Sequence, residues 1–239
     1  MIVSLFIFLV LIVAAEGLPD KMPNKNCTKL GKIRIFAVMK IIFATANRGK
    51  LREAAEILGE SFELLTPHDL GIDEDIPETG DTLMENSIQK AQYLYERLGC
   101  DCFADDTGLE VDALGGAPGV HSARYAGEGH DFAANIRKLL HELEGVPYEQ
   151  RTARFKNVVT LILDGEMHFF EGCLEGHIAL ERAGTQGFGY DPVFVPDDFP
   201  DRTVAELGEE VKNTISHRGK SLRAMAAWLN GHMQGTDIA

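Results

Sequence analysis

The chain has 239 residues, of which 45% are hydrophobic and 25% are charged. This composition is typical of a folded globular protein and excludes a disordered or low-complexity chain. The formal net charge of −14 argues against general binding of nucleic acid, which depends on neutralising phosphates with lysine and arginine. If so acidic a protein handles an anion, we expect it to use a few local cations together with a divalent metal ion.

The N-terminal segment differs from the rest of the chain. Residues 1–15 are an apolar run, shorter than a membrane span and close to the length of a signal-peptide core, but without the usual preceding basic residues. A complete globular pattern begins at Met39-Lys40. We therefore expect 1–38 to be an N-terminal extension, 39–233 to be the functional domain, and the location to be cytoplasmic. A signal peptide or anchor within residues 1–17, with membrane contact through it, remains the alternative.

From residue 40 onward, strand-like and helix-like patterns alternate. Asp164-Gly165 separates two long extended runs and is a strong signal for a two-residue hairpin. In chain order, the sequence predicts a strand at 40–46, a helix at 48–58, a strand at 62–65, a helix at about 81–98, a short strand at 102–104, a glycine-rich excursion at 108–129, a helix at 130–143, the hairpin strands 153–163 and 166–178, a glycine-rich turn at 184–191 and a helix at about 216–229.

This order predicts the class of fold. Alternating strands and helices with an inserted antiparallel hairpin indicate an α/β protein. The hairpin could form a second lobe, with a cleft between the two lobes.

The first predicted strand leads directly into a polar turn, residues 45–50, that begins a helix. The first turn of a helix offers unpaired N–H groups and the positive end of the helix dipole, and Lys50 adds a full charge. The turn therefore suits phosphate, although an ordinary strand-to-helix turn is the alternative. It is not a Walker A loop, because Ala44 and Leu51 replace the required glycine and hydroxyl residue, so a P-loop kinase is disfavoured.

Carboxylates follow the short strand predicted at 102–104. Asp105 and Asp106 come at its expected carboxyl end, where ligands bind in open α/β sheets, and neighbouring side chains point to opposite faces. Glu78 lies in a stiff turn before the long helix, and Glu78 with Asp106 would suit Mg²⁺, which one or two carboxylates typically hold. A solvated strand end is the plainer interpretation. Glu85 is either a helix cap, as in a capping box, or a support for the metal.

Two segments nearer the C-terminus suit a nucleotide. At 212–220, Ser216 can cap the last helix and leaves His217 and Arg218 in its first turn, where cations are unfavourable unless an anion binds. At 187–192, two glycines, two aromatics and Asp191 could stack on a flat ring and accept a hydrogen bond from a base edge. A solvated basic turn and a tight turn with core aromatics are the alternatives.

Taken together, these segments resemble the inosine triphosphate pyrophosphatase family, also called the non-canonical purine NTP pyrophosphatases. The resemblance runs from about Met39 to Leu229 and leaves residues 1–38 outside. Ala46 stands where this family more often has glycine, and Thr107 where it often has serine; neither change removes a needed functional group. The matching segments are 45–50, 77–80 with Glu85-Asn86, 104–109, 115–119 followed by 122–125, 187–192 and 216–218.

The resemblance implies Mg²⁺-dependent hydrolysis of ITP, dITP and XTP to the monophosphate and pyrophosphate, which cleanses the nucleotide pool, and it implies a homodimer. It also implies an α/β fold with an elongated mixed sheet and two lobes that flank a central nucleotide-binding cleft. In this family resemblance, Glu78 and Asp106 would bind the metal, and Asp106 would be the catalytic base. The substrate-binding residues that it implies are Thr45, Ala46, Asn47, Arg48, Gly49, Lys50, Thr107, Phe188, Gly189, Tyr190, Asp191, Lys212, His217 and Arg218.

Two other functions stay open at this point. A pyrophosphatase of similar architecture could prefer other bases, as the Maf-like enzymes do with modified pyrimidines, dTTP and UTP. A tethered nucleotide sensor could use the same cleft without turnover. Selectivity for a purine with a carbonyl at C6 would follow from donors such as His217 and Arg218, because a mismatched base leaves buried donors unpaired, which can be worth roughly 10⁴-fold.

Overall fold

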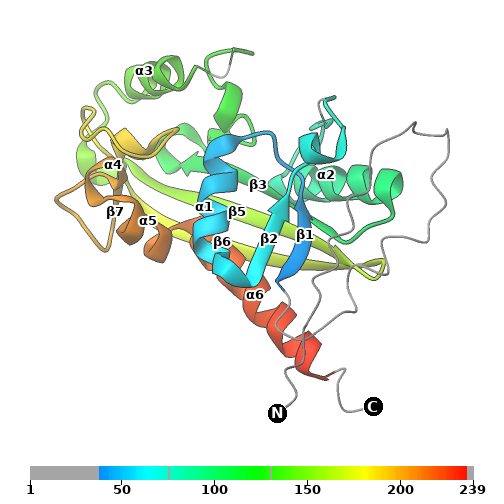
Figure 1. Ribbon diagram of the computed structural model, residues 1–239. Coiled ribbons are helices and arrows are strands. Elements are labelled where there is room, and N and C mark those ends of the chain that lie inside the picture. The colour runs from blue at the N-terminus through cyan, green and yellow to red at the C-terminus, as the bar shows by residue number, and fades with distance from the viewer. Residues whose placement is uncertain (1–37, 75, 130, 236–239) are drawn as a thin grey trace, which may run out of the picture.

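The computed structural model describes residues 38–74, 76–129 and 131–235 (Figure 1). Within these ranges, seven strands form one open mixed sheet in the order β2-β1-β3-β5-β6-β7, with β4 beside β3. The strands are β1 (Met39–Phe43), β2 (Phe62–Leu65), β3 (Cys102–Val111), β4 (Pro118–Gly119), β5 (Thr152–Leu163), β6 (Glu166–Ile178) and β7 (Phe194–Pro196). The helices are α1 (Arg48–Leu58), α2 (Leu83–Leu98), α3 (Phe132–Glu142), α4 (Val204–Leu207), α5 (Glu209–Ile215) and α6 (His217–Gly235).

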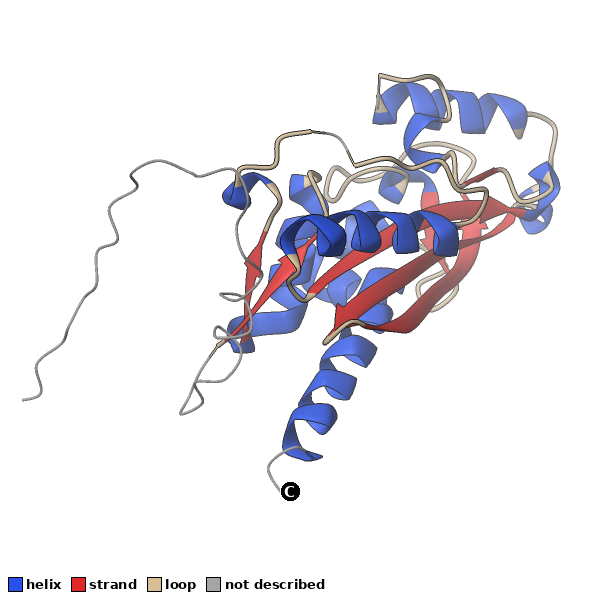
Figure 2. Cartoon of the chain, turned by 90° about the vertical axis from the view of Figure 1, so that its right-hand side faces the viewer, coloured by secondary structure: helices blue, strands red, loops and turns tan. Residues whose placement is uncertain are grey.

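Helices cover both faces of the sheet. Helices α1 and α6 pack on one face and α2 on the other, where it crosses the front of the sheet in Figure 2. Strand β1 shows the alternation that this requires: Ile41 and Phe43 join the α1–α6 core, whereas Ile42 joins the α2 core. A third core lies between α3 and the far ends of β3, β5 and β6. The predicted α/β class with a mixed sheet is confirmed.

Strand β1 is parallel to both β2 and β3, and the remaining pairs are antiparallel. Helix α1 makes the crossover that a parallel β1–β2 pair needs. At the hairpin turn, Asp164 and Gly165 both have positive φ, 50° and 86°, as a type I′ turn requires. The helix predicted at 48–58, the strand predicted at 62–65 and the hairpin are therefore confirmed.

The short strand predicted at 102–104 is wrong in length. Strand β3 continues to Val111, because β5 pairs with it along its whole length, including Asp105↔Val159 and Asp106↔Val158. The two carboxylates therefore lie in the middle of a strand. They still lie just past the carboxyl end of β1, whose pairing with β3 stops at Phe43↔Phe103.

The predicted glycine-rich excursion at 108–129 also begins inside this strand. Gly108 belongs to β3, and a Cβ atom there would lie 2.7 Å from the carbonyl oxygen of Gly119 in β4. The close approach of β4 therefore depends on the glycine.

Two features of the chain remain predictions. Residues 1–37 lie outside the described part, so the N-terminal extension and the 39–233 boundary are untested by the structure. Among the helices that the structure describes, none combines the length and apolar character needed to cross a bilayer. The two lobes with a nucleotide cleft between them also stay a prediction.

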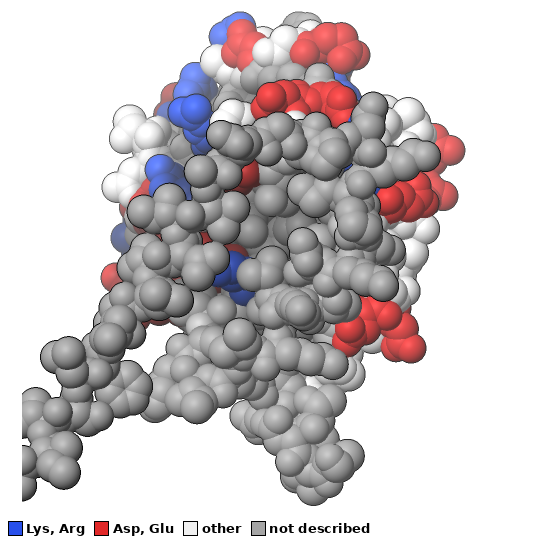
Figure 3. All heavy atoms as spheres, turned by 45° about the vertical axis from the view of Figure 1, so that its right-hand side comes forward, with Lys and Arg blue, Asp and Glu red and all other residues white. Residues whose placement is uncertain are grey.

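Acidic side chains gather along one side of the face in Figure 3, in keeping with the net charge of −14.

Candidate active site

One group of charged residues lies on the α2 face of the sheet, and we call Glu78, Lys90 and Asp106 the α2-side cluster. The buried Lys90 donates to Glu78 Oε1 at 2.7 Å and to Asp106 Oδ1 at 2.9 Å. Asn86 Nδ2 lies 3.4 Å from the other oxygen of Asp106. The two carboxylates predicted to hold a metal thus meet at Lys90, and Arg124 Nη2 lies 3.8 Å from the other oxygen of Glu78.

The position of Glu78 is fixed by the loop that carries it. The Gly80 N–H donates to Asn86 Oδ1 at 2.8 Å, and a Cβ atom on Gly80 would lie only 2.6 Å from Glu85 Cβ. The loop is thus held close to the first turn of α2. Glu85 Oε2 accepts from the Thr82 N–H at 3.0 Å, and Thr82 Oγ1 accepts from the Glu85 N–H at 3.1 Å. Glu85 is therefore a helix cap.

Electrostatics keep this cluster charged. Burial works against ionisation of Glu78, but the Lys90 ammonium outweighs it and lowers the pKa of that carboxyl. Burial also works against protonation of Lys90, but Asp106 and Glu78 outweigh it and raise the pKa of the ammonium. Glu78 is ionised and Lys90 protonated at neutral pH.

A second group lies on the opposite face, and we call it the α6-side cluster. Asp105, 1% exposed, accepts from Lys50 Nζ at 2.9 Å and from Arg218 Nε at 3.0 Å. Arg218 also donates to Thr107 Oγ1 at 3.1 Å and pairs with Glu53. The full set comprises Lys50, Glu53, Asp105, Asp191, Lys212 and Arg218.

Lys212 connects the remaining members of the α6-side cluster. Its Nζ lies 2.5 Å from Glu53 Oε1 and 2.6 Å from Asp191 Oδ2. Asp191 Oδ2 also accepts from the Phe188 N–H at 2.8 Å, so this carboxylate shapes the segment 187–192, which we call the aromatic loop. Burial dominates over Lys212 and raises the pKa of Asp191.

Asp105 shows the opposite balance. Burial would raise the pKa of this carboxyl, but Lys50, Arg218 and Lys90 together outweigh burial and hold the pKa well below its usual range. Asp105 therefore stays ionised, and its two oxygens bind the side chains of α1 and α6 to the sheet.

The predicted phosphate turn places Lys50 beside this cluster, but some of its expected donors are already used. Asn47 caps α1, and its Oδ1 accepts from the N–H groups of Gly49 at 2.9 Å and Lys50 at 3.2 Å. Thr45 Oγ1 accepts from the Asn47 N–H at 3.1 Å. Ala46 and Arg48 lie exposed on the same turn. The turn therefore faces solvent, with Lys50 as its link to β3.

The aromatic loop lies against this turn. A Cβ atom on Gly49 would lie 3.0 Å from the Phe188 ring, and Lys212 Nζ lies 4.5 Å from the centroid of that ring. Gly189 follows with φ of +63°. Tyr190 is instead a core residue, 4% exposed, whose hydroxyl donates to the Ser122 carbonyl at 2.9 Å. Phe188 is thus positioned to meet a ligand, whereas Tyr190 supports the loop from inside.

His217 stands out because its Nδ1 is buried without a hydrogen-bond partner in the described residues. Its ring stacks on Phe155 with centroids 4.7 Å apart. Burial, with Arg218 and Lys212 nearby, lowers the pKa of His217 well below 6.5, so the ring is neutral. Ser216 caps α6 as predicted, since its Oγ accepts from the Gly219 N–H at 2.9 Å. An unpaired buried nitrogen in this place suits a polar ligand.

The sequence interpretation missed two charged residues that hold the site together. Glu53 lies one helical turn after Lys50 on α1, and this i, i+3 spacing was a usable signal. Lys90 follows Leu83 and Ser87 and precedes Leu94 at helical spacing, so it lies on the buried face of α2. A lysine on that face needs carboxylate partners, and Glu78 and Asp106 supply them.

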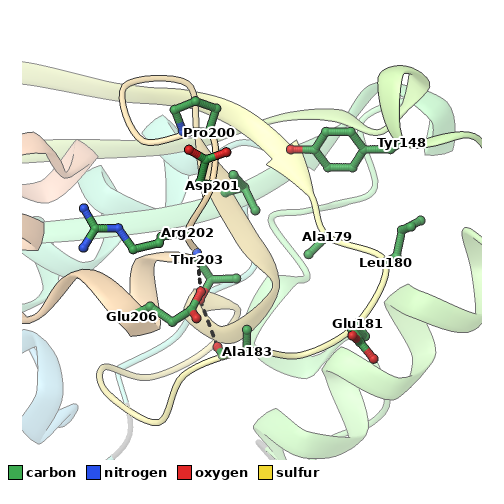
Figure 4. Close-up of a pocket in the computed structure, with 11 residues that line it drawn as sticks. Tyr148, Ala179, Leu180, Glu181, Ala183, Pro200, Asp201, Arg202, Thr203 and Glu206 are labelled. Carbon is green, nitrogen blue, oxygen red and sulfur yellow. Dashed lines mark hydrogen bonds between the residues drawn. The ribbon is translucent and has the colours of Figure 1, made fainter.

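A separate hollow of about 350 Å³ lies beside β7 and α4 (Figure 4). In it, Thr203 Oγ1 donates to the Ala183 carbonyl at 2.9 Å. Its lining contains none of the residues predicted for the site. The lining residues are Tyr148, Ala179, Leu180, Glu181, Ala183, Val195, Pro200, Asp201, Arg202, Thr203 and Glu206.

Comparison with known proteins identifies the family to which this chain belongs. Residues 41–228 match the model of the Ham1 family, and the chain belongs to this family. It is 52% identical to the dITP/XTP pyrophosphatase of Porphyromonas gingivalis, over 80% of this chain and 97% of that protein. It is 50% identical to the dITP/XTP pyrophosphatase of Flavobacterium johnsoniae, over 78% and 96%.

Solved structures show the same fold. The Ham1 protein from Coxiella burnetii is similar to this chain with a TM-score of 0.74 and 38% identity, over 81% of this chain and 99% of that one. The Staphylococcus aureus Ham1 protein gives a TM-score of 0.73 and 39% identity, over the same shares.

Proposed function

We propose that this protein hydrolyses the non-canonical purine nucleoside triphosphates ITP, dITP and XTP to the monophosphate and pyrophosphate, with Mg²⁺ as cofactor. The single observation that carries the chemistry is the meeting of Glu78 and Asp106 at Lys90. Relatives named dITP/XTP pyrophosphatase, 46–52% identical over 96–100% of their own length, support the reaction and substrate class.

The α2-side cluster fits a magnesium ion. Its two carboxylates offer only oxygen donors and already converge on one positive charge. In the described residues, no three His, Cys, Asp or Glu side chains form a group that could hold a metal. Mg²⁺ commonly uses only one or two carboxylates and completes its shell with water and substrate phosphates. When bound by Glu78 and Asp106, the ion would neutralise charge on the triphosphate.

Side chains of the protein would bind the triphosphate, activate the attacking water and hold the base. Lys50 ends the exposed turn 45–50, donates to Asp105, and is near enough to Glu78 to lower the pKa of that carboxyl, so we place the triphosphate beside Lys50. Asp106 would take the proton from the water that attacks the α-phosphorus, and pyrophosphate would leave. Phe188 would stack on the base, and His217 and Arg218 would lie near its edge.

An assay of pyrophosphate release tests this function. The wild-type protein with Mg²⁺ is offered dITP, XTP, dATP, dTTP and UTP in parallel, and we expect rapid release from dITP and XTP. A preference for dTTP or UTP would favour the Maf-like alternative, and binding of dITP without release would favour a nucleotide sensor. The homodimer is a proposal from the family resemblance, and sedimentation analysis would test it. The cytoplasmic location is a proposal that depends on residues 1–38 being an extension.

A further inference from the structure

An aromatic side chain outside every segment that predicted the site lies next to it. Phe132 begins α3, at the top left of Figure 1, far in sequence from the aromatic loop at 187–192. Its ring centroid lies 6.2 Å from that of Phe188, with the two planes tilted by 40°. This geometry is within the usual range for an aromatic pair. The two rings therefore form one aromatic surface built from two distant segments.

The cap of α3 and its buried core contacts come from residues other than Phe132. It is 39% exposed, whereas Ile136 and Leu139 on the same helix are buried in the core. Asp131 caps the helix, with its Oδ1 accepting from the Ala134 N–H at 3.0 Å. Because both the cap and the core contacts come from other residues, the ring of Phe132 is free to serve a ligand.

The surroundings of Phe188 show where a ligand would lie. A Cβ atom on Gly49 would lie 3.0 Å from its ring, and the Lys212 ammonium and the Arg218 guanidinium lie over the ring, 4.5 Å and 5.7 Å from its centroid. Phe132 is the neighbouring aromatic. A flat base placed beside Phe188, with its phosphates toward Lys50, would come within reach of the Phe132 ring.

We propose that Phe132 is a second aromatic wall of the base-binding site, and that it stacks on the purine ring of the substrate together with Phe188. This inference rests on the proposed function for the identity of the ligand. A single exposed phenylalanine would mean little by itself, since scattered apolar side chains are normal on protein surfaces. The contact with Phe188 distinguishes this one.

Stacking has a recognisable signature. A ring stacks on any base, because every base has a π face, so Phe132 adds affinity without reading the base edge. Its loss should raise KM for dITP and dATP by the same factor and leave their ratio unchanged. It should also leave unchanged the inhibition by inorganic triphosphate, which has no base.

The test compares Phe132→Ala, Phe132→Leu and Phe132→Tyr with the wild-type protein. We expect the alanine and leucine variants to raise KM for dITP about five- to tenfold with kcat within about twofold, and the tyrosine variant to match the wild type. Phe169→Ala is the control, because Phe169 is equally exposed at 45% but lies on β6. We expect it to behave as the wild type.

Three results would overturn the proposal. They are an unchanged KM for dITP in Phe132→Ala, a wild-type KM for dITP in Phe132→Leu, or a weakening of inhibition by inorganic triphosphate as large as the rise in KM. Calorimetric binding of dIMP, which keeps the base but cannot be cleaved to pyrophosphate, separates this inference from the proposed function. If the wild type binds dIMP but releases no pyrophosphate from dITP, the proposed activity fails. Weaker dIMP binding by Phe132→Ala than by Phe169→Ala would then still support the stacking wall, and equal binding would reject it.

Discussion

The two charged clusters differ although they share neighbouring residues of one strand. In the α6-side cluster, three carboxylates are matched by three cations, and every member but Lys50 is nearly inaccessible. In the α2-side cluster, two carboxylates share one buried lysine, and Arg124 lies 3.8 Å from Glu78, where both side chains are 34% exposed. The first cluster is closed off from solvent, whereas the second opens to solvent at Glu78.

The difference follows from the alternation of side chains along β3. Asp105 points to the face where α1 and α6 deliver Lys50 and Arg218, and Asp106 points to the face where α2 delivers Lys90. Because the two oxygens of Asp105 already accept from Lys50 and Arg218, this carboxylate is poorly suited to bind a metal ion or a proton. The two adjacent aspartates thus have different roles. Asp105 links α1 and α6 to the sheet, and we expect Asp106 to bind the metal and act as the base.

The largest effect should come from removing the framework charge. Asp105→Asn leaves Lys50 and Arg218 buried beside a neutral amide, and we expect the free energy of unfolding to fall by about 3 kcal/mol. Urea denaturation measures this. Asp112→Asn is the control, because Asp112 pairs with Arg154 at the exposed surface and its loss should cost less than about 1 kcal/mol. Equal stability of the two variants would show that Asp105 is no more structural than a surface residue.

Asp106→Asn should affect activity rather than stability. Lys90 keeps its contact with Glu78 at 2.7 Å, so we expect a fold close to that of the wild type. Loss of the base should lower kcat for dITP by at least about 10²-fold. Steady-state kinetics measure the loss of kcat, and denaturation of the same preparation measures the stability of the fold. Turnover near the wild-type rate would remove Asp106 from the mechanism.

Helix caps and turns could be predicted from the sequence, whereas the position of the two aspartates within β3 could not. Local rules placed the helix cap at Ser216 and the hairpin turn at Asp164, because short-range hydrogen bonds and backbone angles decide both. They placed Asp105 and Asp106 at a strand end, because nothing local reveals that β5 pairs with β3 past residue 104.

The same limit explains the missed charges. The helical spacing of Glu53 and Lys90 gives only a weak local signal, and their partners, more than ten residues away, are set by the tertiary structure. The substrate contact of Tyr190 stays a prediction, and local rules could not show that its side chain is buried in the core beside α3 and donates to the distant carbonyl of Ser122. Motif order could identify the site, whereas the ion pairs that organise it required the tertiary structure.

A smaller effect should come from the exposed member of the α2-side cluster. Glu78→Gln keeps the shape of the side chain but removes one of two charges offered to the metal, so we expect the half-maximal Mg²⁺ concentration to rise about tenfold. Excess Mg²⁺ should restore most of the activity. Magnesium titrations of turnover measure this, and Glu74→Gln, which alters an exposed partner of Arg97, is the control. An unchanged magnesium requirement would place the metal elsewhere.

The smallest effect concerns the pH dependence of stability in the α6-side region. His217 is buried and neutral, with Arg218 and Lys212 nearby, so the folded protein resists its protonation while the unfolded chain takes up the proton near pH 6.5. Stability should therefore fall as the pH drops below about 6.5, by at most about 1.4 kcal/mol per pH unit from this residue. Denaturation of the wild type and His217→Gln between pH 7.5 and pH 5 measures it, and the variant should show the shallower decline.

A histidine with the opposite environment serves as the control for this measurement. Glu144 raises the pKa of the exposed His141, so that side chain contributes stability at low pH and loses it as the pH rises through its pKa. His141→Gln should therefore steepen the acid decline, whereas His217→Gln should flatten it. Because the two histidines differ in burial and in the sign of their neighbours' charge, opposite changes in slope would tie the pH response to the site. Parallel slopes in both variants would contradict a buried, neutral His217.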